Sequence, residues 1–182
     1  MKETTQESYP LYWRMLESFE ELQPEKTMAA FLVEILGSIR QTVATAESCT
    51  GGLVSAAIVS VPGASQVFQN GFITYCDEAK HRLLQVKEET LASYTAVSAQ
   101  VAAEMAYGCA LVGQSDLALA VTGLAGPGGG TQEKPVGLVY VSSCYRQRVL
   151  VQEYHFCGDR EEIRRQAVAA ALQLGAFHLR AR

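Results

Sequence analysis

The sequence predicts an α/β fold, a three-layer α/β/α sandwich built on a mixed β-sheet. Segments with strand and helix character alternate along the chain after residue 27, which is typical of helices packed on both faces of a sheet. The run 117–121, Leu-Ala-Leu-Ala-Val, is apolar throughout, as expected of a strand covered on both faces. Two strand-like segments, 136–145 and 149–156, follow each other around a polar turn and predict an antiparallel pair.

Hydrophobic periodicity places the remaining elements. Apolar residues recur at helical spacing over 28–40, which predicts the first helix. Short strands are expected over 42–46 and 71–75. The other expected helices are about 51–60, 77–85, 98–112 and 161–180, with Ser98 and Asp159 as N-caps of the last two.

Residues 1–27 differ from the rest of the chain and are interpreted as an N-terminal extension to one domain over 28–182. The extension combines charged residues with the aromatic side chains of Tyr9, Tyr12, Trp13 and Phe19. The segment 11–22 predicts one short amphipathic helix. We expect its aromatic side chains to dock either on the domain or on a neighbouring subunit.

Composition and charge exclude several classes of protein. Hydrophobic residues make up 48% of the 182 residues, enough to bury a core without metals or disulfides. With 15 basic and 19 acidic residues the net charge is −4, and no basic run predicts a nucleic-acid partner. Residues 1–7 lack the apolar core of a signal peptide and no apolar run is long enough for a membrane span, so we expect a cytoplasmic protein. The five cysteines include no CxxC pair, which predicts reduced thiols and no zinc site.

A serine-containing turn, Glu47-Ser48-Cys49-Thr50-Gly51-Gly52, connects an expected strand to an expected helix. Ligands bind at such strand ends in α/β sheets, and the first amides of the helix can bind an oxyanion or a phosphate. Ser48 is therefore a candidate nucleophile, although the same pattern fits a serine or threonine that caps the helix. Cys49 is a rival nucleophile, but it needs an activating partner, and none of the three histidines has a spacing that supplies one.

The segment from Tyr75 to Lys80 supplies a candidate base for Ser48. If Asp77 is the N-cap, Lys80 falls in the first helical turn, where the helix dipole and burial disfavour a cation. A neutral amine is the form that a general base requires, and Tyr75 can relay the proton or hold the hydroxyl. The alternative is that Lys80 is an exposed helix lysine and Tyr75 an aromatic residue of an edge strand.

A second glycine-rich loop, 122–130, follows the most apolar strand and offers the Thr122 hydroxyl and bare amides. It matches neither the Walker pattern nor the Rossmann fingerprint, so it either contacts a substrate or is a mobile surface loop. Arg160 and Arg164 lie one helical turn apart and can face one anion. Pairing with the neighbouring acidic residues Glu161 and Glu162 is the other possibility for these arginines.

Taken together, these motifs resemble the CinA C-terminal domain family over about residues 28–180. The resemblance rests on six blocks in the same order: Ala46 to Gly52, Gly71 to Tyr75 with Glu78 to Lys80, Ala96 to Ser98, Thr122 to Pro127, Lys134 to Gly137, and Gly158 to Arg160 with Arg164 to Ala167. One departure concerns Asp77, because the family often has asparagine there. A carboxylate near Lys80 favours its protonated form and opposes the role of base.

The resemblance implies a nicotinamide-nucleotide amidohydrolase, which converts nicotinamide mononucleotide and water into nicotinic acid mononucleotide and ammonia. It implies Ser48, Tyr75 and Lys80 as the catalytic set, no metal or organic cofactor, a small-molecule nucleotide substrate and a homo-oligomer. Substrate contacts are expected from the following residues: Glu47, Thr50, Gly51, Gly52, Thr122, Gly123, Gly126, Arg160 and Arg164. The alternatives are a non-catalytic module that binds a nucleotide or a partner, and an amidase that acts on another small amide.

Overall fold

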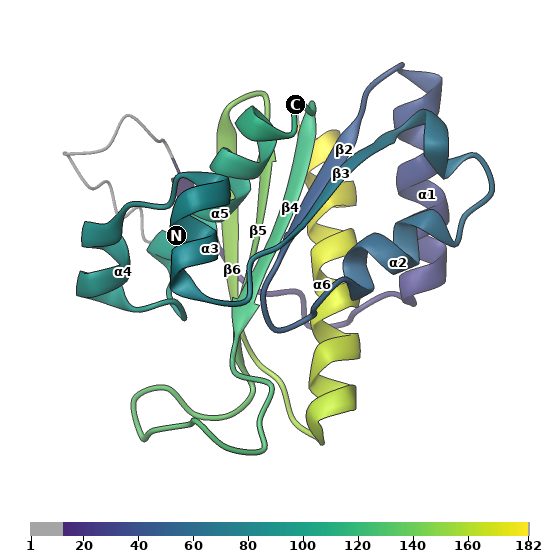
Figure 1. Ribbon diagram of the computed structural model, residues 1–182. Helices are drawn as coiled ribbons and strands as arrows, with labels where there is room; N and C mark the ends of the chain where they lie inside the picture. The colour runs from purple at the N-terminus through teal and green to yellow at the C-terminus, as the bar shows by residue number, and fades with distance from the viewer. Residues whose placement is uncertain (1–12, 182) are drawn as a thin grey trace.

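A mixed six-stranded sheet forms the centre of the computed structural model, which describes residues 13–181 (Figure 1). The strands are β1 (Trp13–Leu16), β2 (Val43–Glu47), β3 (Phe68–Ile73), β4 (Leu117–Gly123), β5 (Leu138–Tyr145) and β6 (Arg148–His155). Their order across the sheet is β1-β6-β5-β4-β2-β3. β2, β3 and β4 run parallel to one another, whereas β5 is antiparallel to both β4 and β6. The predicted mixed sheet is confirmed.

Helices cover both faces of this sheet, as the three-layer prediction requires (Figure 1). One face carries α1 (Glu25–Ser38), α2 (Leu53–Val59) and α6 (Arg160–Arg180). The other carries α3 (Asp77–Leu84), α4 (Glu88–Tyr94) and α5 (Ala99–Val112). Within the described residues no helix is long and apolar enough to cross a membrane.

The central strand β4 shows why this sequence forms a sheet buried on both faces. Side chains alternate across a strand. Leu117 and Leu119 therefore pack into the core beneath α1 and α6, while Ala118 and Ala120 pack beneath α5. The small alanines on the second face allow α5 to approach the sheet closely.

The N-terminal segment corrects one prediction. Residues 13–16 form β1 at the edge of the sheet, parallel to β6, and not part of the amphipathic helix expected over 11–22. Trp13 and Met15 pack on one face of the sheet and Leu16 on the other, which is the period of a strand. Phe19 packs edge-on against Phe177 of α6, with ring centroids 5.9 Å apart, so Trp13 and Phe19 dock on the domain, while Tyr9 and Tyr12 lie outside the described residues. Residues 11 and 12 of the expected helix lie outside the described residues.

Candidate active site

The carboxyl ends of three neighbouring strands assemble the candidate site. Ser48 follows β2, Thr74 follows β3, and Thr122 lies near the end of β4. The parallel register pairs Glu47 with both Ile73 and Val121, which brings these three positions to one edge of the sheet. This is the edge at which ligands bind in open α/β sheets.

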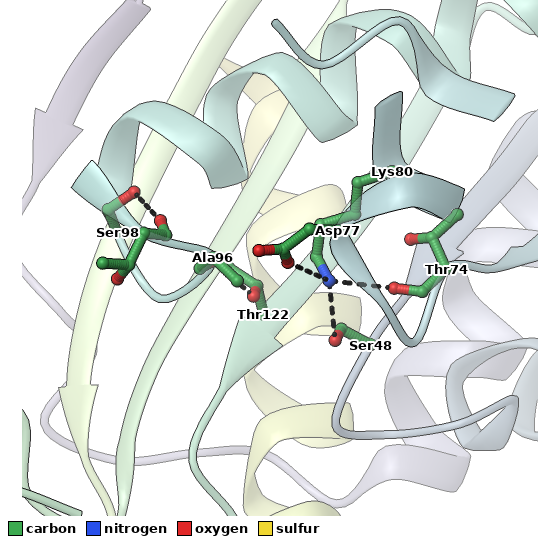
Figure 2. Close-up of polar contacts among 8 residues, drawn as sticks. Ser48, Thr74, Asp77, Lys80, Ala96, Ser98 and Thr122 are labelled. Carbon is green, nitrogen blue, oxygen red and sulfur yellow. Dashed lines mark hydrogen bonds and ion pairs between the residues drawn. The ribbon is translucent and has the colours of Figure 1, made fainter. Parts of the chain in front are cut away.

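Lys80 of α3 reaches from the neighbouring helix to the predicted nucleophile (Figure 2). Its Nζ lies 3.3 Å from Ser48 Oγ and 3.0 Å from the carbonyl oxygen of Thr74. Lys80 is 1% exposed and Ser48 is 9% exposed, so the pair is shielded from bulk water. The structure therefore joins the two residues that were predicted as nucleophile and base, 32 positions apart in the chain.

Two opposing effects act on the charge of Lys80. Burial lowers the pKa of this amine, because a charged group is poorly solvated away from water. Asp77 opposes the shift, since its Oδ1 lies 3.8 Å from Nζ. The net direction is a lowered pKa, which increases the fraction of neutral amine.

Asp77 does not cap α3, in contrast to the prediction. Cys76 occupies the N-cap position, Asp77 is the first helical residue, and the N-cap makes no side-chain bond to the helix. Lys80 consequently sits just after the first turn. The Asp77 carboxylate is oriented toward the Lys80 ammonium and not toward the helix amides (Figure 2).

Glu47 has a structural role that the sequence did not reveal. Its carboxylate accepts bonds from the amides of Gly52, Val54 and Ser55 at 2.8–3.0 Å, and from the Ser55 hydroxyl at 2.8 Å. Glu47 is 1% exposed, and both of its oxygens are engaged. It therefore caps α2, a role that differs from the predicted substrate contact. The amides it binds cannot also stabilise an oxyanion, as the sequence had suggested.

Tyr75 contacts Arg160 and, within the described residues, makes no hydrogen bond to the Ser48–Lys80 pair. Its side chain is exposed, and its hydroxyl accepts a bond from Arg160 at 3.1 Å. The same guanidinium donates to the carbonyl oxygen of Gly126 at 2.5 Å. Among the described contacts, the Tyr75 hydroxyl bonds to neither Ser48 nor Lys80, so the predicted proton relay is not formed in this structure.

Arg164 binds the serine turn itself and, over residues 13–181, pairs with no acidic side chain. Its Nε donates to the carbonyl oxygen of Cys49 at 3.0 Å, and its second terminal nitrogen donates to that of Thr50 at 2.8 Å. Arg160 and Arg164 were expected to face one anion. In the structure each bridges neutral groups around the turn and the glycine-rich loop, and the contact with an anion stays a prediction.

The remaining predicted contacts stabilise the walls of the site. Thr122 Oγ1 donates to the carbonyl oxygen of Ala96 at 2.7 Å (Figure 2). A Cβ at position 123 would lie 2.7 Å from the Leu138 carbonyl oxygen, so only glycine fits there. Gly51, Gly52 and Gly126 adopt positive φ angles of 59°, 102° and 74°. These glycines satisfy backbone requirements, since L side chains rarely adopt this conformation.

Lys134 is a wall residue to which the sequence reasoning assigned no role. Its ammonium donates to the carbonyl oxygens of Tyr94 and Val97 at 2.7 and 2.8 Å, and to Thr95 Oγ1 at 2.6 Å. It thereby fixes the same turn whose Ala96 carbonyl accepts from Thr122. The sequence indicated only the motif that contains Lys134, residues 134–137. It did not indicate the hydrogen-bond partners of Lys134, because they lie 37 or more positions away in the chain.

Two buried hydroxyls near the Ser48–Lys80 pair have no hydrogen-bond partner among the described residues, namely Oγ1 of Thr50 and Oγ1 of Thr74. Thr50 follows Ser48 by two positions, and Thr74 provides the carbonyl that binds Lys80. An unpaired buried polar group costs about 1–3 kcal/mol. Such groups are expected where water or a ligand completes the site.

Cys49 is unsuited to nucleophilic attack. Its side chain is buried, and burial raises the pKa of the thiol to about 11. The thiolate, which is the nucleophilic form, is therefore scarce near neutral pH. Within the described residues, no group of three histidine, cysteine or acidic side chains is placed to hold a metal ion.

A cavity of about 550 Å³ opens between α1, α2 and α6, on the far side of the serine turn. Its lining includes Leu53 and Arg164, but neither Ser48 nor Lys80. The Ser48–Lys80 pair is therefore located by the strand ends and not by this cavity.

The chain is similar to a family model and to curated relatives. The model described as the CinA C-terminal domain matches residues 25–177. A provisionally named competence-damage inducible protein of Clostridium novyi is 50% identical over 149 residues, which cover 82% of this chain and 36% of that protein. A CinA-like protein of Kosmotoga olearia is 47% identical over 148 residues, which cover 81% of this chain and 36% of that protein. The chain thus spans about a third of the length of these relatives.

Solved structures share the fold along most of the chain. The competence/damage inducible protein CihA of Agrobacterium tumefaciens has a TM-score of 0.81 and 40% identity, covering 86% of this chain and 96% of that chain. A competence damage-inducible protein A of Klebsiella pneumoniae has a TM-score of 0.84 and 34% identity, covering 87% and 99% respectively. The family match, these structures and the geometry of the strand ends agree, and the chain belongs to the CinA C-terminal domain family.

Proposed function

We propose that this chain hydrolyses the carboxamide of nicotinamide mononucleotide, with Ser48 as nucleophile and Lys80 as general base. The observation that carries the proposal is the 3.3 Å contact between Ser48 Oγ and the buried Nζ of Lys80. A serine hydroxyl needs an adjacent base to become nucleophilic, and a lysine with a lowered pKa can serve. The choice of substrate rests on the resemblance to nicotinamide-nucleotide amidohydrolases.

The hydrogen-bond inventory of a neutral Lys80 fits the first half of this reaction. In the structure the Lys80 amine donates to the Thr74 carbonyl and to Ser48 Oγ. In the neutral amine a lone pair takes the place of the N–H that faces Ser48, so the Ser48 hydroxyl can donate to it. Ser48 Oγ attacks the carboxamide carbon as Lys80 takes its proton. The tetrahedral intermediate then collapses, the carbon–nitrogen bond breaks, and the Lys80 proton leaves with ammonia. The product of this half-reaction is an acyl-enzyme at Ser48.

Water then hydrolyses the acyl-enzyme, and Lys80 again acts as the base. Lys80, again neutral, accepts a proton from a water that attacks the acyl carbon, and Ser48 leaves with that proton. Arg160 is the group best suited to the substrate phosphate at the rim. It has five N–H donors, and neutral acceptors on Gly126 and Tyr75 use two of its nitrogens. In this proposal Tyr75 orients Arg160 and takes no part in proton transfer.

The test is ammonia release from nicotinamide mononucleotide by the full chain. Ser48→Ala and Lys80→Met should each lower kcat by about 10³-fold or more, as expected when a nucleophile or its base is removed. Ser60→Ala is the matched control, because Ser60 is exposed and its hydroxyl donates only to the Ala57 carbonyl. Activity of Ser48→Ala equal to that of wild type would overturn the assignment of the nucleophile.

One specific observation favours a second candidate, a nucleotide-binding module without catalysis. Asp77 faces Lys80 at 3.8 Å and stabilises its charged form, which cannot act as a base. For such a module, nicotinamide mononucleotide would raise the melting temperature while no ammonia appears. Ammonia release from another small amide, but not from this nucleotide, would instead identify an amidase of different specificity.

A further inference from the structure

The backbone amides around Ser48 fall into two groups. Most already have acceptors: the amide of Ser48 donates to the Val121 carbonyl, that of Gly51 to the Ser48 carbonyl and that of Leu53 to the Thr50 carbonyl. Glu47 takes the next amides of α2. Among the described residues, the Thr50 amide has no acceptor, and the Cys49 amide contacts only the thiol of its own residue. These two amides directly follow the nucleophile.

Arg164 controls the direction of the Thr50 amide. The carbonyl of one residue and the N–H of the next point in opposite directions across a planar trans peptide. Because Arg164 binds the Cys49 carbonyl at 3.0 Å, the Thr50 N–H points away from Arg164. The Ser48 carbonyl is likewise held by Gly51 at 3.1 Å, which fixes the Cys49 N–H.

We propose that Arg164 is a positioning residue, which holds the turn so that the amides of Cys49 and Thr50 bind the oxyanion formed when Ser48 attacks. This inference rests on the proposed function of Ser48 and adds the group that stabilises its transition state. Cys49 and Thr50 are 6% and 0% exposed, so an oxygen that reaches their amides is held away from water. Hydrogen bonds to a developing charge are strongest in such surroundings.

The charge of Arg164, like its hydrogen bonds, favours binding of an oxyanion by these amides. Glu47 places a carboxylate at the start of α2, which offsets the positive end of that helix. The ion pairs of the described chain leave the Arg164 guanidinium without a carboxylate partner. A cation bound to a peptide carbonyl polarises that peptide group and strengthens its N–H as a donor. Arg164 thus supplies the positive charge that the capped helix does not.

The experiment compares Arg164→Met and Arg164→Lys with Arg165→Met. Arg165 is the matched control on the same helix, since it is 68% exposed and pairs with Glu161. The first readout is labelling of Ser48 by a fluorophosphonate probe, followed by intact mass. In this step the Ser48 Oγ–phosphorus bond forms, the phosphorus–fluorine bond breaks, fluoride leaves, and the serine proton passes to Lys80. The phosphoryl oxygen gains negative charge as a carboxamide oxygen would.

We expect Arg164→Met to label at least about tenfold more slowly than wild type and to lower kcat for ammonia release by about 10²-fold, the typical loss of one oxyanion donor. KM and the pH midpoint of activity should change little, because Lys80 is untouched. Arg164→Lys keeps the charge without the two-pronged contact and should recover part of the rate. Arg165→Met should match wild type in both readouts.

Three results would overturn the inference: Arg164→Met labelled at the wild-type rate, a wild type that is not labelled at Ser48, or a variant whose KM rises while kcat is kept. Arg164→Lys replaces Arg164→Met if the latter does not fold, as judged by its melting curve. A further outcome is that wild type is labelled at Ser48 and Arg164→Met is labelled more slowly, yet wild type releases no ammonia from nicotinamide mononucleotide. This result would support the inference. The same result would refute the proposed substrate.

Discussion

Asp77 Oδ1 lies 3.8 Å from Nζ of Lys80, and the two side chains differ sharply in exposure, 58% against 1%. A carboxylate in contact with solvent thus faces an amine that is almost completely buried. The pKa of Lys80 reflects both, because burial lowers it and Asp77 raises it. This pair therefore determines the pH at which the proposed base becomes neutral.

Replacing Asp77 by Asn should move the acidic limb of the activity profile to lower pH. The substitution removes the charge that raises the pKa of Lys80, so the neutral amine forms at lower pH. The measurement is kcat for ammonia release as a function of pH at low salt, where the attraction is least screened. Glu78→Gln is the control, since Glu78 is exposed and pairs with Arg82. A limb that stays in place in Asp77→Asn would contradict this account of Lys80.

Replacing Glu47 by Gln should destabilise the fold. Glutamine replaces one of the two carboxylate oxygens by an NH2 group, so either the amides of Gly52 and Val54 or the amide and hydroxyl of Ser55 lose their acceptor. We expect a loss of about 2–4 kcal/mol in the free energy of unfolding, measured by urea denaturation. Glu161→Gln should change this free energy by less than about 0.5 kcal/mol, because Glu161 is exposed. An unfolding curve of Glu47→Gln that matches wild type would refute the capping role.

The sheet and its main helices were predictable because periodicity is a local signal. β1 and α4 escaped prediction because both are short and depend on distant contacts. β1 has four residues and pairs with β6, more than 130 positions away. The start of α4 is held by Glu104 of α5, which accepts from the Lys87 amide and from the Thr90 hydroxyl. Neither contact leaves a pattern in the local sequence.

The site was predictable in its residue types but not in its pairings. Ser48 and Lys80, which the structure brings into contact, were predicted because each lies at a strand end or a helix start. Arg164 was assigned to an anion of the substrate, and Glu47 was among the residues of the serine turn expected to contact the substrate. Their partners are backbone groups of the serine turn, which only the folded chain brings within reach. A charged residue beside a nucleophile can hold the backbone as well as a ligand.

Cys49 should react slowly with thiol reagents although it lies next to Ser48. With a pKa raised to about 11 by burial, about one Cys49 thiol in a thousand is ionised at pH 8. Iodoacetamide at pH 8 should therefore modify the exposed Cys76 and Cys157 first, as followed by peptide mass analysis. Cys49→Ala should keep ammonia release within about threefold of wild type, since its amide remains in place. Rapid alkylation of Cys49 in the folded protein would contradict its buried, protonated state.

His178 is a buried histidine far along α6 from the serine turn. It is 4% exposed, with Nδ1 3.0 Å from Ser143 Oγ and its ring 5.8 Å from that of Tyr145. Burial lowers its pKa from 6.5 to about 4, and the charges of Arg148 and Arg14 act in the same direction. The folded protein therefore keeps this imidazole neutral at pH values where an unfolded chain protonates it.

The stability of the fold should fall as the pH is lowered from about 6.5 to about 4, and His178→Gln should remove most of this loss. Between these values the unfolded state binds a proton that the folded state does not, which lowers the free energy of unfolding by up to about 3 kcal/mol. Urea unfolding at a series of pH values measures the slope. His155→Gln is the control, because His155 is exposed and contacts Glu153. Equal slopes in wild type and His178→Gln would show that other groups carry the acid sensitivity.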